Sequence, residues 1–281
     1  MNHQPYAFIG CETPYNTADL VLFGAPFDST TSYRPGARFG PGAMRVESYG
    51  LETYSPYQDR DLCDIPVFDA GDLELPFGDP GPALDCIEAF TENLLRDGKR
   101  PVLLGGEHLV TLGVLRALAK AHPGIHILHF DAHADLREQY LGQTLSHACV
   151  IRRVWELTGD GHIHQWGIRS GSREEFSFAA QGHVEQRKFD CDGFVQAVER
   201  LRGQPVYVTI DLDVLDPSLF CGTGTPEAGG IAFDTLIRCI PAMGRMDVKG
   251  FDLCELAPQL DPSGVSTATA CKVLREMLLA V

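Results

Sequence analysis

Short runs of apolar residues recur along the chain, separated by stretches with helical periodicity. The runs lie at residues 20–23, 65–68, 102–104, 125–130, 163–168, 206–210 and 248–253, with a weaker candidate at 183–189. Runs of this length, rich in β-branched and aromatic residues, predict strands. Apolar residues spaced near every 3.6 positions predict helices at 82–95, 109–121, 194–201 and 233–243. This alternation indicates an α/β fold whose mostly parallel sheet is covered by helices on both faces.

The chain shows no sign of a division into domains. We find no fixed-period repeat, low-complexity tract or long linker in the sequence. The Gly- and Pro-rich segments at 33–42 (YRPGARFGPG) and 221–230 (CGTGTPEAGG) are too short to be linkers. We therefore expect residues 1–281 to form a single domain.

Four of the predicted strands run directly into polar residues. The polar residues that follow them are Glu107 and His108, then Asp131, His133 and Asp135, then Asp211, Asp213 and Asp216, and finally Cys254 and Glu255. The carboxyl ends of parallel strands meet at one edge of a sheet, where ligands bind. We therefore expect these four clusters to converge although they are far apart in the sequence.

The spacing within two clusters suggests a metal site. Asp131, His133 and Asp135 stand at alternate positions, which point the same way in an extended segment, and so do Asp211 and Asp213. Crowded carboxylates raise one another's pKa values, and divalent cations relieve that repulsion. Carboxylates mixed with imidazole suit Mn²⁺ or a similar metal, whereas thiolates would favour zinc. Two metals about 3.5–4 Å apart would share a water and lower its pKa.

Each of these residues also has a purely structural interpretation when it is taken alone. A single D-x-H or D-x-D is commonly a capped turn, and His108 would suit the start of a helix. Asp216 before Pro217 is a good turn residue, and His126 and His129 are expected to be core histidines because they lie within an apolar strand. The coincidence of three clusters at three strand ends favours the metal site.

Charge and cysteine content narrow the possible partners. The formal net charge of −15 and the pI of about 5.0 argue against nucleic acid and anionic membranes as partners and suit a cationic substrate, although acidity also serves solubility. Nine widely spaced cysteines without a C-x-x-C pair indicate reduced thiols in a cytoplasm. No apolar run approaches the roughly 18 residues of a membrane span, and we see no secretion signal at the N-terminus.

Together, the motifs resemble those of the ureohydrolase family, which includes arginase and agmatinase. The matching stretches are GAPFDSTTSYRPGARFGP (24–41), GGEH (105–108), DAHAD (131–135), SH (146–147), DLDVLDP (211–217), GTGTPEAGG (222–230) and Glu255. The resemblance implies a three-layer α/β/α domain with a central, mostly parallel sheet of about eight strands. It also implies two Mn²⁺ per subunit, a cytoplasmic homo-oligomer (trimer or hexamer), and hydrolysis of a guanidinium group to urea.

The resemblance also assigns roles to individual residues. The first Mn²⁺ would be held by His108, Asp131, Asp135 and Asp211. The second would be held by Asp131, His133, Asp211 and Asp213, so that Asp131 and Asp211 bridge the pair. Glu255 matches the carboxylate that holds the guanidinium. His147 matches a lid-loop histidine that relays protons, a task suited to a group titrating near pH 7.

The choice of substrate depends on less specific segments. The loop at 136–150 lacks the Asn-Thr-Pro stretch with which arginases bind an amino acid, and RPGARFGP (34–41) and GTGTPEAGG look more like agmatinases. We expect agmatine as the substrate, with putrescine and urea as products. Glu138 and Glu227 are candidates to meet the distal amine, but we favour the interpretation that both are ordinary surface charges. Cys149 is either a redox-sensitive thiol or, in our preferred interpretation, a small buried residue.

Several alternatives share some of these features. Hydrolases of guanidinobutyrate, guanidinopropionate, arginine or formiminoglutamate have the same metal motif. A deacetylase-like amidohydrolase would use one zinc ion and would not need the second ligand set. A non-catalytic homologue that binds a partner protein would be expected to have lost a ligand or the lid histidine, and no such loss is visible.

Overall fold

The computed structural model describes residues 6–281, and its centre is one eight-stranded sheet. From one edge to the other, the strands are β4 (Val67–Asp72), β1 (Leu20–Ala25), β5 (Arg100–Gly105), β10 (Asp247–Cys254), β9 (Pro205–Asp211), β6 (His126–Phe130), β7 (Ile163–Ile168) and β8 (Glu185–Lys188). Every neighbouring pair in this sheet is parallel. The predicted mostly parallel sheet of about eight strands is confirmed, and so is the weaker strand candidate at 183–189.

Helices connect these strands, and half of them were predicted. Within residues 6–281 the α-helices are α1 (Gly40–Glu47), α2 (Pro80–Arg96), α3 (Thr111–Ala121), α4 (Val150–Thr158), α5 (Arg173–Phe178), α6 (Phe194–Arg200), α7 (Phe233–Met243) and α8 (Val265–Ala280). The periodicity identified α2, α3, α6 and α7. It missed α1, which begins inside a Gly- and Pro-rich segment with Pro41 in its first turn. It also missed α8, which is buried around most of its circumference and so lacks an amphipathic pattern.

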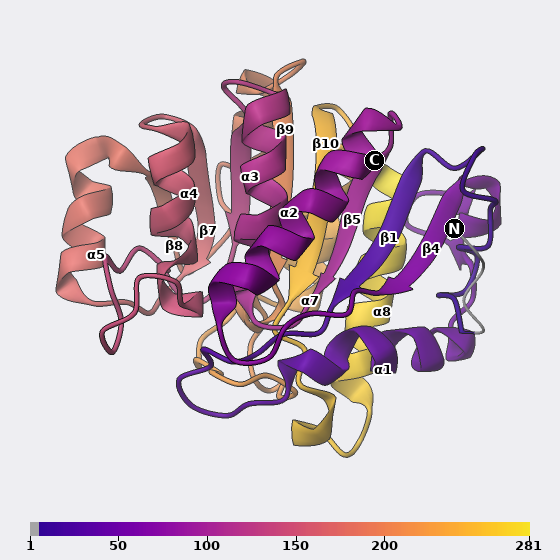
Figure 1. Cartoon of the computed structure of the whole chain (residues 1–281), viewed down its shortest axis with the longest axis horizontal. Coiled ribbons are helices and arrows are strands. Elements are labelled where there is room, and N and C mark those ends of the chain that lie inside the picture. The colour runs from indigo at the N-terminus through magenta and orange to yellow at the C-terminus, as the bar shows by residue number, and fades with distance from the viewer. Residues whose placement is uncertain (1–5) are drawn as a thin grey trace.

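The helices form two layers, one on each face of the sheet (Figure 1). Successive residues of β1 point to opposite faces: Leu20 and Leu22 pack in one apolar cluster, and Val21 and Phe23 in the other. Helices α2, α3 and α4 cover the second face, whereas α1, α6, α7 and α8 cover the first. The three-layer α/β/α arrangement is thus confirmed. A short antiparallel pair, β2 (Tyr54–Ser55) with β3 (Arg60–Asp61), lies outside the sheet and was not predicted.

Four adjacent strands at the middle of the sheet position the candidate site. They are β5, β10, β9 and β6, the strands whose runs were followed by polar clusters in the sequence. Because all four are parallel, the chain leaves each of them at the same edge. Within residues 6–281, no helix combines the length and the apolar character needed to cross a membrane.

Candidate metal centre and active site

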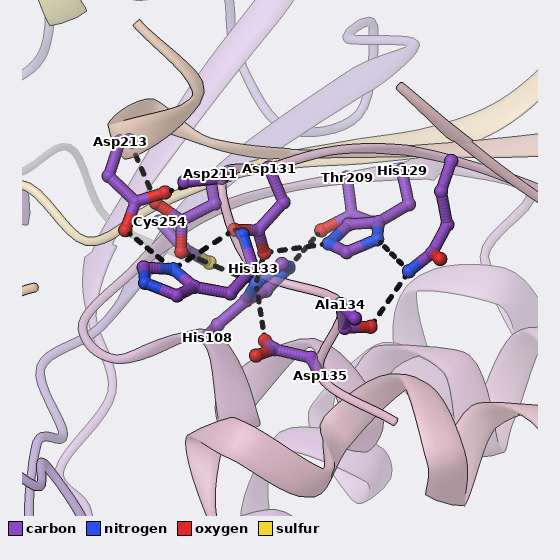
Figure 2. A network of polar contacts seen from close by, with 12 residues as sticks. His108, His129, Asp131, His133, Ala134, Asp135, Thr209, Asp211, Asp213 and Cys254 are labelled. Carbon is purple, nitrogen blue, oxygen red and sulfur yellow. Dashed lines mark hydrogen bonds and ion pairs between the residues drawn. The ribbon is translucent and has the colours of Figure 1, made fainter. Parts of the chain in front are cut away.

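The structure brings all six predicted metal ligands together at this edge (Figure 2). One group surrounds His108, which follows β5. Its Nδ1 lies 3.1 Å from Asp131 Oδ2, 3.4 Å from Asp135 Oδ2 and 3.4 Å from Asp211 Oδ2. His108 is almost completely buried, and so are the three carboxylates.

A second group surrounds His133 on the other side of Asp131. His133 Nδ1 lies 3.1 Å from Asp213 Oδ2 and 3.4 Å from Asp131 Oδ1. Asp131 therefore presents one oxygen to each group: Oδ2 to His108 and Oδ1 to His133. One carboxylate thus belongs to two sets of convergent donor atoms.

Turns, rather than extended chain, produce this convergence. Asp131 Oδ1 accepts a hydrogen bond from the His133 backbone N–H at 2.6 Å, and Asp211 Oδ1 accepts one from the Asp213 N–H at 2.9 Å. Leu212–Val214 forms a 3₁₀ turn, and Asp135 has a positive φ of 52°. The prediction that these side chains converge is confirmed, but the extended geometry that we expected is wrong.

Two site residues lie in a backbone region that L-residues rarely adopt. Asp135 has a φ of 52° and Glu255 a φ of 67°, a conformation that costs of order 1–3 kcal/mol and tends to cluster at functional sites. The Glu255 N–H donates to the Gly106 carbonyl at 2.9 Å, and Glu255 Oε1 accepts from the His108 N–H at 2.8 Å. A Cβ on Gly106 would lie 2.0 Å from the Phe27 carbonyl oxygen, so glycine is required there.

The electrostatics of the carboxylates differ from one to the next. Burial and the charge of Asp131 raise the pKa of Asp135 to about 7. Burial and the charges of Asp213 and Asp131 raise the pKa of Asp211 well above its ordinary value. For Asp131, burial acts in the same direction, but the surrounding histidines outweigh it and lower its pKa. The prediction that crowded carboxylates raise one another's pKa values is thus confirmed for Asp135 and Asp211. It is wrong for Asp131, because three histidines surround that carboxylate.

The two central histidines show that positive charge is favoured at this position. Burial alone would lower the pKa of His108, but its contacts with Asp131, Asp135 and Asp211 raise that pKa well above the ordinary value. For His133, burial also acts downward, and the Asp213 carboxylate, together with Asp131, raises the pKa. The carboxylates therefore stabilise a cation at the centre of each group.

The donor atoms also fit metal coordination. An octahedron with bonds of about 2.1 Å has edges of about 3 Å, close to the donor separations of 3.1–3.4 Å. The ligand atoms of His108, Asp131 and Asp135 lie within 4.8 Å of one another, and so do those of Asp131, His133 and Asp213. The chain therefore carries a candidate metal centre of histidine and aspartate.

A hydrogen-bond chain fixes the orientation of His108. The Thr209 hydroxyl donates to Asp252 Oδ1 at 2.6 Å, so its oxygen accepts from His108 Nε2 at 2.7 Å. Asp252 is completely buried, and its other oxygen accepts from the hydroxyls of Tyr207 (2.7 Å) and Thr111 (2.9 Å). The neutral imidazole of His108 thus carries its hydrogen on Nε2 and presents the Nδ1 lone pair to the carboxylates.

His147 lies on the loop that covers the site. Its backbone N–H donates to the Thr30 hydroxyl at 3.1 Å, and its Nε2 lies 3.0 Å from the Ser32 hydroxyl. Thr30 in turn donates to the buried carboxylate of Glu107 through both N–H and O–H. Burial and the charge of His133 lower the pKa of His147 to about 4, so the expectation of titration near pH 7 is wrong.

A cavity of about 210 Å³ opens beside the two groups. Its lining includes His133, Asp135 and His147, together with Arg137 and Glu175. Neither Glu138 nor Glu227, the two candidates for the distal end of a substrate, is among the described residues that line this cavity.

Glu175 is a residue that sequence reasoning missed. Its carboxylate is buried, accepts from the Leu136 N–H at 2.9 Å, and lies 3.4 Å from Arg137 Nε. It also accepts from the Ser172 N–H at 2.6 Å, which completes a capping box at the start of α5. The Ser-x-x-Glu spacing of this capping box is the sequence signal from which Glu175 could have been identified.

Two arginines fix the loop at 222–230 over the site. Arg169, which follows β7, donates to the backbone carbonyls of Asp213 (2.7 Å) and Glu227 (2.8 Å). Arg34 donates to the carbonyls of Thr223 (2.6 Å) and Gly224 (3.2 Å). Neither arginine was singled out in the sequence, because such contacts depend on the fold alone.

The structure also shows the surroundings of four other residues singled out in the sequence. Asp216 accepts hydrogen bonds from the N–H groups of Ser218 and Gly229, as expected of a turn residue. Cys149 is completely buried, and burial raises the pKa of its thiol to about 11, which favours the small buried residue over a reactive thiol. Of the two expected core histidines, His129 is fully buried, and His126 is partly exposed.

Comparisons with known proteins agree with this geometry. The sequence profile of the Arginase family matches residues 18–280. The chain is 48% identical over 275 residues to an agmatinase of Bacillus subtilis (strain 168), covering 97% of this chain and 95% of the relative. It is 41% identical to an N(1)-aminopropylagmatine ureohydrolase of Thermococcus kodakarensis, covering 89% and 88%. Its structure resembles that of a putative agmatinase from Clostridium difficile, with a TM-score of 0.93, 46% identity, and coverage of 95% and 99%. The chain therefore belongs to the arginase family of ureohydrolases.

Proposed function

We propose that this protein hydrolyses agmatine to putrescine and urea at a centre of two Mn²⁺ ions. The observation that carries the proposal is the position of Asp131, whose two oxygens face two separate histidine-carboxylate groups beside a cavity. Relatives with near full-length similarity to the chain include an agmatinase and an aminopropylagmatine ureohydrolase. The net charge of −15 also favours a dicationic substrate.

The proposed ligands are the six residues that the structure brings together: His108, Asp131, His133, Asp135, Asp211 and Asp213. Their mixture of carboxylate and imidazole suits Mn²⁺. When bound, the two cations supply a nucleophilic water at neutral pH. Asp131, which faces both groups, and Asp211, which matches the second shared carboxylate of the family motif, would be the shared ligands.

Glu255 would hold the guanidinium. Its carboxylate is buried, and burial and the neighbouring charge of Glu107 raise its pKa well above the ordinary value. A carboxylate in this setting gains most from a cationic partner, with which it forms charge-assisted hydrogen bonds. The positive φ of Glu255 and its bond to the His108 N–H fix the carboxylate beside the metal ligands.

His147 would move protons for the leaving amine. With its pKa lowered to about 4, its imidazole is neutral at pH 7 and accepts a proton only transiently. Its contacts with Thr30 and Ser32 hold the ring at the cavity. The proton taken up from the attacking water would then be passed to the departing amine nitrogen.

The far end of the substrate would lie near Glu175. Apart from Asp135, Glu175 is the carboxylate among the described residues that line the cavity, and it is already paired with Arg137. The presence of Arg137 in the same lining favours a second candidate, a guanidine with a terminal carboxylate such as 4-guanidinobutyrate. Agmatine and 4-guanidinobutyrate differ in the sign of this terminal charge, so a direct comparison separates them.

We also propose that the chain acts as a single domain in a cytoplasmic homo-oligomer. All eight principal strands belong to one sheet, which supports a single domain. All nine cysteines are free, which supports a reducing compartment. Large apolar side chains such as Phe77 (95% exposed) and Leu141 (81% exposed) support burial against another subunit.

The proposal is tested by measuring urea release from the Mn²⁺-loaded protein with agmatine, arginine and 4-guanidinobutyrate in parallel. We expect urea from agmatine. Urea from 4-guanidinobutyrate alone would keep the metal centre and overturn the choice of substrate in favour of the second candidate. If the protein binds two metals but releases urea from none of the three substrates, the proposed activity is contradicted.

Metal stoichiometry and urea release together distinguish the remaining rivals from the proposed enzyme. A deacetylase-like amidohydrolase would bind one Zn²⁺ per chain and would not need His133 and Asp213. A non-catalytic homologue would release no urea from any guanidine. Elemental analysis of the purified protein, alongside the urea assay, therefore separates both rivals from the proposed enzyme.

A further inference from the structure

His129 has no role in the proposed chemistry, yet it lies directly against Asp131. It is part of β6 and is completely buried. Its Nε2 lies 2.8 Å from Asp131 Oδ2 (Figure 2). Its Nδ1 lies 2.9 Å from Gln165 Nε2. Both ring nitrogens are therefore engaged, so His129 is not placed to bind an ion itself, although its atoms lie close to those of His108 and Asp135.

The hydrogen positions follow from one backbone carbonyl. The Ala134 carbonyl can only accept, so the nitrogen of the Gln165 amide must be the atom that faces it at 2.8 Å. The same nitrogen donates to His129 Nδ1, while Gln165 Oε1 accepts from Gln186 Nε2 at 2.8 Å. Nδ1 of His129 is thus an acceptor, and the neutral imidazole carries its hydrogen on Nε2. That hydrogen is donated to Asp131 Oδ2.

The consequence is that both oxygens of Asp131 are fixed. Oδ1 accepts from the His133 N–H at 2.6 Å, and Oδ2 accepts from His129 Nε2. With one donor on each oxygen, the carboxylate cannot rotate about its terminal bond without losing both hydrogen bonds. Each oxygen keeps a second lone pair for the group that it faces, His108 for Oδ2 and His133 for Oδ1.

We propose that His129 is a positioning residue that holds Asp131 in the orientation that serves both metal groups, and that Gln165 fixes the imidazole in the form required. The proposal rests on the proposed two-metal centre, and it adds a chain of residues that links β7 and β8 to that centre. A carboxylate shared by two ions is sensitive to rotation, because a small turn favours one ion at the expense of the other. Hydrogen bonds to ligating groups typically affect metal affinity by about 10–100-fold.

The test is to titrate the full-length protein with Mn²⁺ and to measure binding from the electron paramagnetic resonance signal of free Mn²⁺. His129→Leu removes the donor, and we expect Mn²⁺ affinity to fall by about 10–100-fold. His129→Gln keeps an N–H near the position of Nε2, and we expect it to restore most of that affinity. If His129 only filled space, the two variants would lose Mn²⁺ affinity to the same extent.

A second variant tests the role of Gln165. Gln165→Leu removes the donor to His129 Nδ1 and adds no charge beside the ring. The imidazole is then no longer required to carry its hydrogen on Nε2, and the Nε2 lone pair is free to face Asp131. We expect Mn²⁺ affinity to fall, as in His129→Leu. The matched control is His164→Gln, a buried histidine next to Gln165 on β7 but outside this hydrogen-bond chain, for which we expect wild-type affinity.

Wild-type Mn²⁺ affinity in both His129→Leu and Gln165→Leu would overturn the proposal. Equal losses in His129→Gln and His129→Leu would overturn it too, because packing alone would then explain the effect. If His129→Leu fails to fold, Gln165→Leu and His129→Gln decide the outcome. A wild-type protein that binds two Mn²⁺ without releasing urea would refute only the proposed activity, whereas one that binds fewer than two would overturn both proposals.

Discussion

Two groups of three histidines lie at opposite ends of the same part of the sheet, and only one of them forms a candidate metal centre. The first, which we term the site group, consists of His108, His129 and His133 at the carboxyl edge. The second, which we term the basal group, consists of His126, His162 and His164 near the start of β6 and β7. Both groups include a histidine of β6, so the difference between them arises from what surrounds the rings.

In the basal group, the histidines mainly contact one another. His126 Nδ1 lies 3.2 Å from His164 Nε2, and the rings of His126 and His162 are 4.9 Å apart. Glu185 provides one carboxylate, 2.7 Å from His164 Nδ1. Burial, helped by the neighbouring histidines, lowers the pKa of His126 to about 4, and burial also lowers the pKa of His164.

In the site group, carboxylates reverse the direction of the shift for His108 and His133, whereas at His129 burial outweighs the Asp131 carboxylate and lowers the pKa. The pKa values of His108 and His133 are raised despite burial, because shared aspartates surround them. Clustered histidines therefore do not make a cation site by themselves: the carboxylates between them determine whether positive charge is favoured. The predictions that follow test this contrast, beginning with the largest expected effect.

Replacing the shared carboxylate should remove the difference between the two groups. Asp131→Asn keeps the size of the side chain but removes the negative charge that both metal groups use. We expect loss of bound Mn²⁺ and of urea release together, by more than the roughly 100-fold typical of residues that only support ligands. Metal analysis and the urea assay on the same preparation measure both. Retention of two metals with activity would show that Asp131 is not the shared ligand.

Changing the lid histidine should separate chemistry from metal binding. In His147→Asn, we expect kcat to fall by about 10²–10⁴-fold, the usual contribution of a proton-transfer group, with metal content unchanged. Steady-state kinetics with agmatine, together with metal analysis, provide the measurement. An unchanged kcat across neutral pH would remove His147 from proton transfer.

Neutralising Glu255 should weaken the binding of the guanidinium. A hydrogen bond to a charged group contributes about 1.5–3 kcal/mol, so we expect kcat/KM of Glu255→Gln to fall by about 10–150-fold. Metal content should stay at the wild-type level, because Glu255 is not among the proposed ligands. If Mn²⁺ were lost together with activity, Glu255 would act on the metal centre rather than on the substrate.

The basal group should produce a small effect of pH on stability. The lowered pKa of His126 keeps this residue neutral in the folded protein as the pH falls below about 6.5. In the unfolded chain, where its pKa is about 6.5, His126 takes up a proton. Its contribution is therefore complete above about pH 6.5 and is lost as the pH falls toward about 4. Because His126 is partly exposed, we discount the effect to about 1 kcal/mol.

Urea denaturation at pH 7 and pH 4.5 measures this contribution. His126→Gln should lose about 1 kcal/mol less stability between these pH values than the wild type does. The carboxylates are the same in both proteins, so their contribution to the pH dependence cancels when the two stability changes are subtracted. Identical pH profiles would show that His126 titrates alike in the folded and unfolded states.

The sequence predicted the strands and the metal cluster, because both depend on local patterns. Apolar runs identified all eight strands of the sheet, and the polar residues that follow β5, β6, β9 and β10 identified its functional edge. Helix α8 could not be identified in this way because burial on most sides removes its periodicity. The turns that orient Asp135 and Asp213 also escaped prediction, since side-chain hydrogen bonds and a positive φ replace the extended chain there.

The residues that support the site could not be predicted, because their partners are distant in the sequence. Arg169 contacts the carbonyl of Glu227, and Glu107 contacts Thr30, across separations of 58 and 77 residues. His129 read as an ordinary core residue because its neighbours in β6 are apolar, and only the fold shows its contact with Gln165. The same pattern of residues predicted His126 and His129 to be alike, yet only His129 contacts a proposed metal ligand.

The most direct test of the central claim is anomalous X-ray diffraction from crystals of the Mn²⁺-loaded protein. Our account predicts two anomalous peaks per chain, about 3.5–4 Å apart, with Asp131 contacting both and no peak at the basal histidines. A single peak, or two peaks that do not share Asp131, would contradict it.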